Sequence, residues 1–312
     1  MESNNKVKIK DILLSFLPLV VMVVCEIAIT IIDVLIIFIK NILSVEAIGS
    51  FTVEEIMTQD FNQPMNTAYM TLAQYTVFIL IFGIWFLKLN KKDNITIAPK
   101  VKAFFKNPFM LLLAVAGFMG QIFTDSCMNL LRPMFTDTFD SYDKMVSKSI
   151  GANSSFVMIF CVILIAPIAE ELLFRGVMLH YQKSGFAIAK NSHRKLFIAI
   201  ILVLQGIMFG IYHGNIIQGI YAFVFAIILS LVAIETEDIL PVVLLHISIN
   251  ISALLIPEIL LSTKTGCIIS FFVSLVIFAI CIFFVIKYKD FKITKNNKKN
   301  DEKADVAGEK EN

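Results

Sequence analysis

Two adjacent glutamates, Glu170 and Glu171, directly follow an apolar run whose length and composition are typical of a membrane span. A carboxylate inside a bilayer costs at least about 2.5 kcal/mol, so such residues are functional candidates by default. Because residues four apart share a helix face, Glu171 can pair with Arg175, whereas Glu170 points about 100° away from its neighbour. This predicts a chemical role for Glu170 as a general base or acid and a supporting role for Glu171 and Arg175. The alternative is that both glutamates lie at the cytoplasmic interface and contact water.

Two other apolar segments contain a histidine, and these could complete a hydrolytic site. His213 ends the sequence Phe209-Gly-Ile-Tyr-His213, and His246 lies four residues before Asn250, on the same face of one predicted helix. Counted from the cytoplasmic ends of their spans, these groups and Glu170 can meet in the inner half of the membrane. Glu170 would take a proton from a water oriented by His213, and His246 and Asn250 would donate hydrogen bonds to the oxyanion. The alternative for each histidine is a hydrogen bond between helices.

A metal site is a competing interpretation of the same residues. Glu170, His213 and His246 would form a set of two histidines and one carboxylate with an open position, as in catalytic zinc sites. The chain has no HExxH sequence, so the spacing gives no separate support for a metal. The leading interpretation therefore requires no cofactor, and a divalent metal such as zinc is the alternative.

Composition places the chain among polytopic membrane proteins. Of its 312 residues 57% are hydrophobic, and the mean hydropathy of +0.80 is above that of a soluble domain. A stretch of about 20 apolar residues crosses the hydrocarbon core. Eight such stretches are predicted, at residues 12–39, 68–88, 109–131, 155–180, 196–213, 215–234, 239–257 and 266–287. We therefore predict an all-α polytopic membrane protein of about eight transmembrane helices, with an intramembrane active site and no soluble domain.

The sequence divides into four regions. Residues 1–150 contain the first three spans, 151–257 contain the core spans four to seven, and 258–287 contain the last span. Residues 288–312 form a polar tail that is predicted to be disordered, because it cannot bury apolar surface. Basic residues gather before the first span and in the second and fourth loops, and acidic residues gather in the first and third loops. By the positive-inside rule, this alternation puts both termini in the cytoplasm.

The three polar motifs together resemble a known family. EELLFRG (Glu170–Gly176), FGIYHGN (Phe209–Asn215) and HISIN (His246–Asn250) are similar to the EExxxR, FxxxH and HxxxN motifs of the CAAX prenyl endopeptidase and bacteriocin-processing family, called CPBP or Abi. The motifs have the same order and lie inside apolar spans. The resemblance covers roughly residues 150–255 and does not extend to the first three spans.

This resemblance implies an eight-helix intramembrane fold and glutamate-dependent cleavage of membrane-associated proteins or peptides. By position it maps the catalytic glutamate to Glu170, the paired histidine to His213, oxyanion support to His246 and Asn250, and the supporting pair to Glu171 and Arg175. Family members are often catalogued as metalloproteases, although a metal-free glutamate mechanism is also argued for the fold.

Three classes of function remain open. The leading prediction is an intramembrane endopeptidase that cleaves membrane-embedded or lipid-anchored proteins or peptides in the lipid bilayer, with no nucleic-acid partner. The first alternative is a non-catalytic protein for bacteriocin self-immunity or membrane scaffolding. The second is a proton-coupled transporter, although the chain shows no inverted repeat. The bias toward Ile, Lys and Asn indicates an AT-rich bacterium, so we expect a bacterial plasma-membrane location.

Two further pairs of polar residues lie within predicted spans. Glu26 and Asp33, seven apart, share one face of the first span, and Gln121 and Asp125, four apart, share one face of the third. Each pair could line a path for substrate. A polar stripe that faces the interior of the helix bundle is the favoured interpretation.

Overall fold

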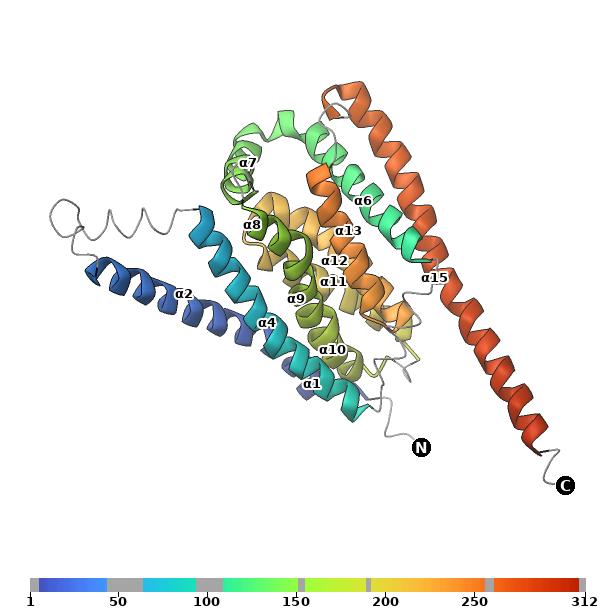
Figure 1. Ribbon diagram of the computed structural model, residues 1–312. Coiled ribbons are helices and arrows are strands. Elements are labelled where there is room, and N and C mark those ends of the chain that lie inside the picture. The colour runs from blue at the N-terminus through green and yellow to red at the C-terminus, as the bar shows by residue number, and fades with distance from the viewer. Residues whose placement is uncertain are drawn as a thin grey trace. The chain divides into compact units, whose positions relative to one another are not determined.

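The computed structural model describes residues 6–43, 64–93, 109–150, 155–188, 192–255 and 261–308, which form helices and turns without a β-strand (Figure 1). In chain order the elements are α1 (Ile9–Leu14), α2 (Leu17–Leu43), α4 (Pro64–Lys92), α6 (Phe109–Leu131), η2 (Arg132–Met134), α7 (Thr136–Ile150), α8 (Phe156–Phe160), η3 (Cys161–Ile165), α9 (Ala166–Glu171), η4 (Leu172–Met178), α10 (Leu179–Gly185), α11 (Arg194–Tyr212), α12 (Ile216–Thr236), α13 (Leu240–Leu255) and α15 (Lys264–Gly308). η2 is a 3₁₀ turn, whereas η3 and η4 are π-helical.

Seven helical segments within these described ranges are long and apolar enough to cross a membrane. They coincide with seven of the eight predicted spans, because a long apolar run in lipid must satisfy its backbone hydrogen bonds within a helix. The remaining predicted span, 239–257, corresponds to the shorter apolar helix α13. The chain is an integral membrane protein, and its predicted all-α polytopic class is confirmed.

Two compact units make up the structure, and each is described by itself. Unit 1 contains Met1–Thr96 and Arg132–Ile227, and unit 2 contains Ile97–Leu131 and Ile228–Asn312. The division falls inside α12, so this helix begins in unit 1 and ends in unit 2. The four regions predicted from the sequence follow the order of the spans along the chain, whereas each unit combines segments that are distant in sequence. The boundaries of the four regions stay predictions.

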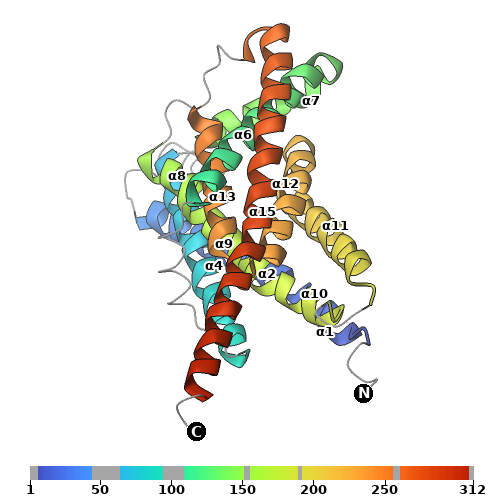
Figure 2. The same cartoon turned by 90° about the vertical axis from the view of Figure 1, so that its right-hand side faces the viewer.

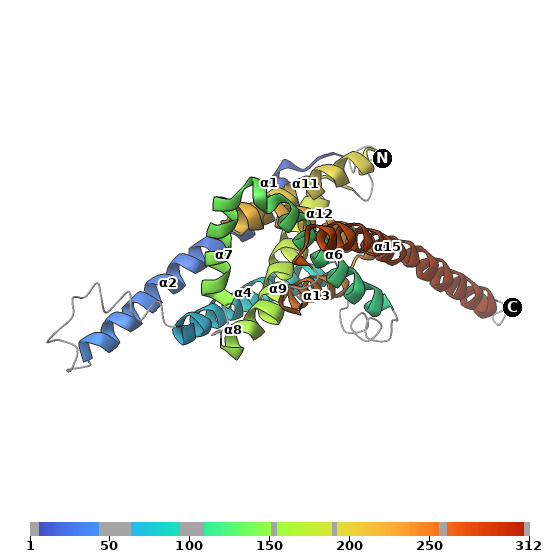
Figure 3. The same cartoon turned by 90° about the horizontal axis from the view of Figure 1, so that it is seen from above.

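Unit 1 is built on a rod in which α8, η3, α9, η4 and α10 continue one another without a loop (Figure 1). Helix α4 runs alongside this rod (Figures 1 and 3). Their contact buries large apolar side chains, among them Phe78 and Phe82 of α4 and Phe174 and Met178 of η4. In lipid such packing stabilises through close van der Waals contact rather than through removal of apolar surface from water.

Pro167 accounts for the first π-helical segment of the rod. Proline has no backbone N–H, and its ring clashes with the carbonyl four residues earlier. The preceding turn is widened, and the Ala166 N–H donates to the carbonyl of Cys161, five residues back. In the second segment the Leu179 N–H donates to the Phe174 carbonyl in the same way. The two glutamates thus end a short α-helical stretch between two widened turns, a feature that is frequent at functional sites.

The far end of the rod is joined to α1. The Lys8 N–H donates to the Gly185 carbonyl oxygen at 2.7 Å, and the Ser184 hydroxyl donates to the Asp11 carboxylate at 2.7 Å. Gly185 is required at this contact, because a Cβ atom there would lie 2.6 Å from Cγ1 of Ile12. α1 therefore anchors the C-terminal end of α10.

Unit 2 contains α6, α13 and α15, which lie side by side (Figures 1 and 2). Gly117 of α6 approaches α13 so closely that a Cβ atom would lie 2.8 Å from the Leu245 carbonyl oxygen and would overlap the Ser248 side chain. The Ser252 hydroxyl donates to the Phe118 carbonyl at 3.2 Å. Small residues at such a crossing allow the close backbone approach that holds helices together in lipid.

Helix α15 continues to Gly308, into the residues 288–312 that the sequence predicts to be disordered. Lysine, glutamate and alanine recur in this stretch and are good helix formers. A helix that has begun in an apolar span also extends without a new nucleus.

Candidate active site

Glu170 is only 7% exposed and lies beside the hydroxyls of two half-buried tyrosines in unit 1. The hydroxyls of Tyr75 and Tyr212 each donate to Oε1 of Glu170 at 3.4 Å. The two hydroxyl oxygens are themselves 3.4 Å apart, so either phenol can donate to the other instead of to Glu170. Three oxygen atoms from α4, α9 and α11 therefore form a triangle among apolar spans. Hydrogen bonds to an ionised carboxylate are stronger than those between neutral groups, so this arrangement can hold a charged or a protonated Glu170.

Aromatic packing fixes the two tyrosines. The Tyr75 ring meets Phe78 edge-on, with ring centroids 6.0 Å apart. The centroid of the Tyr212 ring lies 5.6 Å from that of Phe174 and 6.1 Å from that of Phe209. Because close-packed rings have little freedom to rotate, the positions of the hydroxyls do not depend on the hydrogen bonds alone.

The predicted ion pair between Glu171 and Arg175 is present. Nη1 of Arg175 lies 3.0 Å from Oε1 of Glu171, and both side chains have 0% exposure. Nη2 of Arg175 donates to the Ala226 carbonyl of α12 at 3.2 Å. The pair therefore links the end of α9 and the middle of η4 to α12.

Two phenylalanine rings cover the Arg175 guanidinium. Its Cζ lies 4.8 Å from the Phe209 ring centroid and 5.7 Å from that of Phe174, and these rings meet edge-on at 4.9 Å. Contact with aromatic faces offsets part of the cost of burying a cation. Phe209 also stacks on Tyr212, so one ring connects the ion pair with a partner of Glu170.

His213 directly follows α11, and the turn after it fixes its position. Its ring packs edge-on against Phe209 with centroids 4.8 Å apart, and its centroid lies 5.3 Å from that of Tyr212. Gly214 has a φ of 63°, in the left-handed region that favours glycine. Oδ1 of Asn215 then accepts two backbone N–H groups from the first turn of α12, at 2.9 and 3.2 Å. The chain therefore reverses immediately after His213 and keeps its ring beside Tyr212.

His246 and Asn250 lie on α13 in unit 2. His246 is 7% exposed and Asn250 is half-buried, and their spacing places them on one helix face. The structure thus groups Glu170, the ion pair and the end of α11 in unit 1, whereas His246 and Asn250 belong to unit 2. The convergence of both sets at one site stays a prediction.

In the two additional polar pairs, Glu26, Gln121 and Asp125 form hydrogen bonds within the protein. Nε2 of Gln121 donates to Oδ1 of Asp125 at 2.9 Å, and Gln121 is buried. Oε1 of Glu26 accepts from Nε2 of Gln74 on α4 at 2.9 Å. The contact of Glu26 joins α2 to α4, whereas that of Gln121 lies within α6. That each pair forms a polar stripe facing the interior stays a prediction. Gln74 directly precedes Tyr75, so Glu26 places a second carboxylate on the α2 side of the site.

Tyr75 and Tyr212 are functional candidates that the sequence analysis did not single out. Tyr212 directly precedes His213, and a hydroxyl inside a polar motif was a usable signal. Tyr75 comes from a span that was placed by hydropathy alone, and 95 residues separate it from Glu170. No local pattern connects the two.

Among the described residues, no three His, Cys, Asp or Glu side chains are grouped so that they could hold a metal ion. The contacts of Oε1 of Glu170 described above are phenol oxygens, whereas zinc sites use thiolate, imidazole and carboxylate ligands. The arrangement within unit 1 thus does not by itself supply a zinc ligand set. Dependence on a metal through Glu170, His213 and His246 stays a prediction, and no chemical step below uses one.

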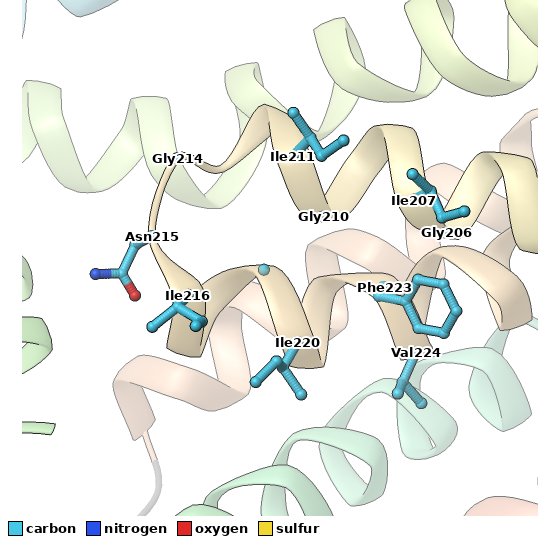
Figure 4. Close-up of a pocket in the computed structure, with 11 residues that line it drawn as sticks. Gly206, Ile207, Gly210, Ile211, Gly214, Asn215, Ile216, Ile220, Phe223 and Val224 are labelled. Atoms are coloured by element: carbon cyan, nitrogen blue, oxygen red, sulfur yellow. The ribbon is translucent and has the colours of Figure 1, made fainter. Parts of the chain in front are cut away.

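An open groove of about 510 Å³ lies where α11 and α12 cross (Figure 4). Glycines from both helices and exposed isoleucines line it, and a Cβ atom at Gly210 or Gly219 would lie 2.8 or 2.9 Å from the carbonyl oxygen of the other. Glu170, Tyr75 and Tyr212 do not line this groove. It reflects close helix packing through small residues and is not part of the candidate active site.

Residues 152–252 match the family model described as type II CAAX prenyl endopeptidase Rce1-like. The match extends from just before α8 into α13, so it contains the six polar motif residues but not Tyr75 of α4. No curated protein and no solved structure matches the chain. The match indicates a membrane-embedded peptidase of the CAAX type. It confirms, for residues 152–252, the family resemblance carried by the three motifs.

Proposed function

We propose that the chain is an intramembrane endopeptidase in which Glu170 activates water to hydrolyse a peptide bond. The observation that carries this proposal is that the buried Glu170 carboxylate contacts the hydroxyls of Tyr75 and Tyr212. The Rce1-like match over the helix that bears Glu170 supports a peptidase.

In the first step, Glu170 takes a proton from a water molecule oriented by His213, and the water oxygen bonds to the carbonyl carbon of the peptide. The carbonyl oxygen becomes an oxyanion, to which His246 and Asn250 donate hydrogen bonds. Glu170 then gives the proton to the peptide nitrogen, the C–N bond breaks, and a carboxylic acid and an amine leave. Water is the only co-reactant, and no acyl-enzyme forms.

In this proposal Tyr75 and Tyr212 hold the carboxylate in position. Each phenol has a single proton to donate, so the pair can support the ionised Glu170 and rearrange when Glu170 is protonated. Distances of 3.4 Å are longer than the usual O–H···O range. Catalytic hydrogen bonds often shorten only when substrate is bound, and we expect these two to do so.

Glu171 and Arg175 support the site without contacting the reacting atoms. Glu171 balances the charge of Arg175, and Phe209 covers the guanidinium. The hydrogen bond to Ala226 fixes η4 against α12. These contacts keep the end of α9 in place while Glu170 gains and loses a proton.

The substrates proposed are membrane-embedded or lipid-anchored proteins or peptides. Glu170 lies in a predominantly apolar helical segment and is nearly inaccessible to solvent, so the scissile bond must reach it from the bilayer. We further propose that the protein resides in a bacterial plasma membrane with both termini in the cytoplasm.

Cleavage of a library of membrane-anchored peptides by the detergent-purified protein tests the proposal. The wild type is compared with Glu170→Gln and with Asp125→Asn, which changes a carboxylate in another span, each with and without a chelator. We expect activity to be lost only in Glu170→Gln and to persist with the chelator. Loss with the chelator would support the zinc alternative, and no turnover by folded wild-type protein would favour a binding or immunity role.

A further inference from the structure

Two glutamines in unit 1, Gln182 of α10 and Gln205 of α11, are completely buried and belong to none of the motifs. Nε2 of Gln205 donates to Oε1 of Gln182 at 2.9 Å and to the Phe174 carbonyl oxygen at 3.2 Å. An amide in an apolar span is costly unless its groups are hydrogen-bonded. A pair of buried amides at this position therefore needs a physical explanation.

The Phe174 carbonyl determines how both amides are oriented. A carbonyl only accepts hydrogen bonds, so Gln205 must present its NH₂ group to it, and that same group then requires the oxygen of Gln182. In this orientation Nε2 of Gln182 and Oε1 of Gln205 have no hydrogen-bond partner. The pair thus serves the Phe174 carbonyl even though two buried atoms stay unsatisfied, which is unusual for an interaction that only stabilises.

Phe174 lies inside the π-helical segment η4. Its carbonyl accepts from the Leu179 N–H, five residues on, and its second lone pair accepts from Gln205. In an α-helical turn the same carbonyl would pair with the Met178 N–H instead. The carbonyl that the Gln205 amide contacts therefore accepts from the Leu179 N–H only when η4 is π-helical.

Gln205 and Phe209 of α11 and His213, which directly follows it, are spaced at intervals of four and continue one helix face. Gln205 bonds to the Phe174 carbonyl, and Phe209 packs on the Phe174 ring. At the end of this face, His213 packs beside Tyr212, whose hydroxyl contacts Glu170. A shift of α11 along the rod would break the first contact and the last one together.

We propose that Gln205, oriented by Gln182, is a positioning residue for the site. It holds η4 in its π-helical form and fixes the register of α11 against the rod, which keeps Tyr212 and His213 beside Glu170. The effect on cleavage rests on the proposed function. The effect on η4 can be measured without any activity.

Kinetics of the cleavage reaction test the positioning role. Gln205→Leu should lower kcat by at least about tenfold and leave KM nearly unchanged, because a misplacement of about 1 Å can cost on the order of 100-fold. Gln182→Leu leaves the bond to Phe174 possible and should lower kcat less. Gln121→Leu is the matched control, since it removes the bond of another buried glutamine, to Asp125 in α6, and should leave kcat near that of the wild type.

Hydrogen exchange provides the readout that needs no substrate. The backbone N–H groups of Leu172–Leu179 should exchange faster in Gln205→Leu than in the wild type or in Gln121→Leu. The double variant Gln182→Leu/Gln205→Leu leaves neither amide buried without its partner, so it should fold even if the single variant does not. It should retain the thermal stability of the wild type and still show low kcat and fast exchange in η4.

Wild-type kcat or wild-type exchange of η4 in folded Gln205→Leu or in the folded double variant Gln182→Leu/Gln205→Leu would overturn the proposal. If the wild-type protein cleaves no substrate, the proposed function fails, and the exchange of η4 alone decides the role of Gln205. Faster exchange confined to η4 would then support that role, and unchanged exchange would refute it.

Discussion

The two adjacent glutamates of α9 have different surroundings on two sides of the same rod. On the phenol side, Glu170 contacts the hydroxyls of Tyr75 and Tyr212. On the guanidinium side, Glu171 pairs with Arg175. A phenol can donate or accept as a carboxylate gains and loses a proton, whereas a guanidinium is permanently charged and requires a carboxylate beside it. The comparison shows that neighbouring residues of one type acquire different chemistry from partners on different helices.

Neutralising one carboxylate at a time tests whether Glu170 and Glu171 have different roles. Glu170→Gln should lower kcat by about 10³-fold, within the range for loss of a general acid–base group, and should leave the thermal unfolding temperature nearly unchanged. Glu171→Gln should instead lower the thermal unfolding temperature, and the fraction that folds should keep cleavage activity. Cleavage rates and thermal unfolding in detergent measure both. A Glu170→Gln protein with wild-type rates would remove the distinction.

On the guanidinium side, charge compensation should dominate stability. Glu171→Gln or Arg175→Met should each destabilise the fold by about 3–5 kcal/mol. The first leaves the buried Arg175 without a counterion, and the second leaves the buried Glu171 without one. The double variant should recover part of that loss, since it buries no charge. Chemical unfolding of the three variants in detergent checks this. Strictly additive losses would show that the two side chains act independently.

On the phenol side, the effect should appear in the rate. Tyr212→Phe keeps the ring packing and removes one hydrogen bond to the carboxylate, so kcat/KM should fall about tenfold, at the low end for bonds to charged groups because the contact is long. Tyr75→Phe should behave similarly. Tyr221→Phe is the control, because it removes a hydroxyl whose oxygen lies 3.0 Å from that of Tyr142 and whose contact does not involve Glu170. Equal effects of all three variants would argue against a specific role.

The smallest expected effect concerns the turn that joins the two sides. Gly214 connects α11, which carries Tyr212, with α12, which carries Ala226. Gly214→Ala should destabilise by about 1 kcal/mol, because a left-handed backbone is unfavourable for a residue with a Cβ atom. Gly83→Ala in α4 is the control, since its Cβ atom would make only an ordinary contact of 3.8 Å with Leu172. Thermal unfolding compares them, and a Gly214→Ala protein as stable as Gly83→Ala would contradict the expectation.

Local patterns predicted the helices and the ion pair well. Hydropathy locates a span because the bilayer requires about 20 consecutive apolar residues, and a spacing of four places Glu171 and Arg175 on one face. Tyr75 could not be found this way, because its contact with Glu170 joins two spans that share no sequence pattern. Gln205 gave a weaker signal, as an amide inside an apolar run, whereas Gln182 lies beyond the end of the predicted span 155–180. The partner of Gln205 is a backbone carbonyl, and no side-chain pattern predicts it.

The widened turns were also outside the reach of sequence patterns. Pro167 marks the first, but η4 contains no proline, and its Phe174 carbonyl is bound by Gln205 on another helix. A tertiary contact thus accompanies a local backbone form. The convergence of His246 and Asn250 with Glu170 depends on non-local placement of the same kind and stays a prediction.

A widened turn contains one residue more than an α-helical turn, and this has a consequence for chain length. Removing one residue from η4 after Arg175, which leaves the spacing of four from Glu171 intact, would turn the segment into an ordinary α-helical turn, while the helices before and after it kept their facing. Removing one residue from α9 or α10 would instead rotate everything beyond it by about 100°. Segment η4 is thus a place where the rod can lose a residue and keep the two glutamates and Ser184 on their faces. The shortened chain would lack only the carbonyl geometry that Gln205 contacts, so a natural deletion here should be accompanied by loss of that glutamine.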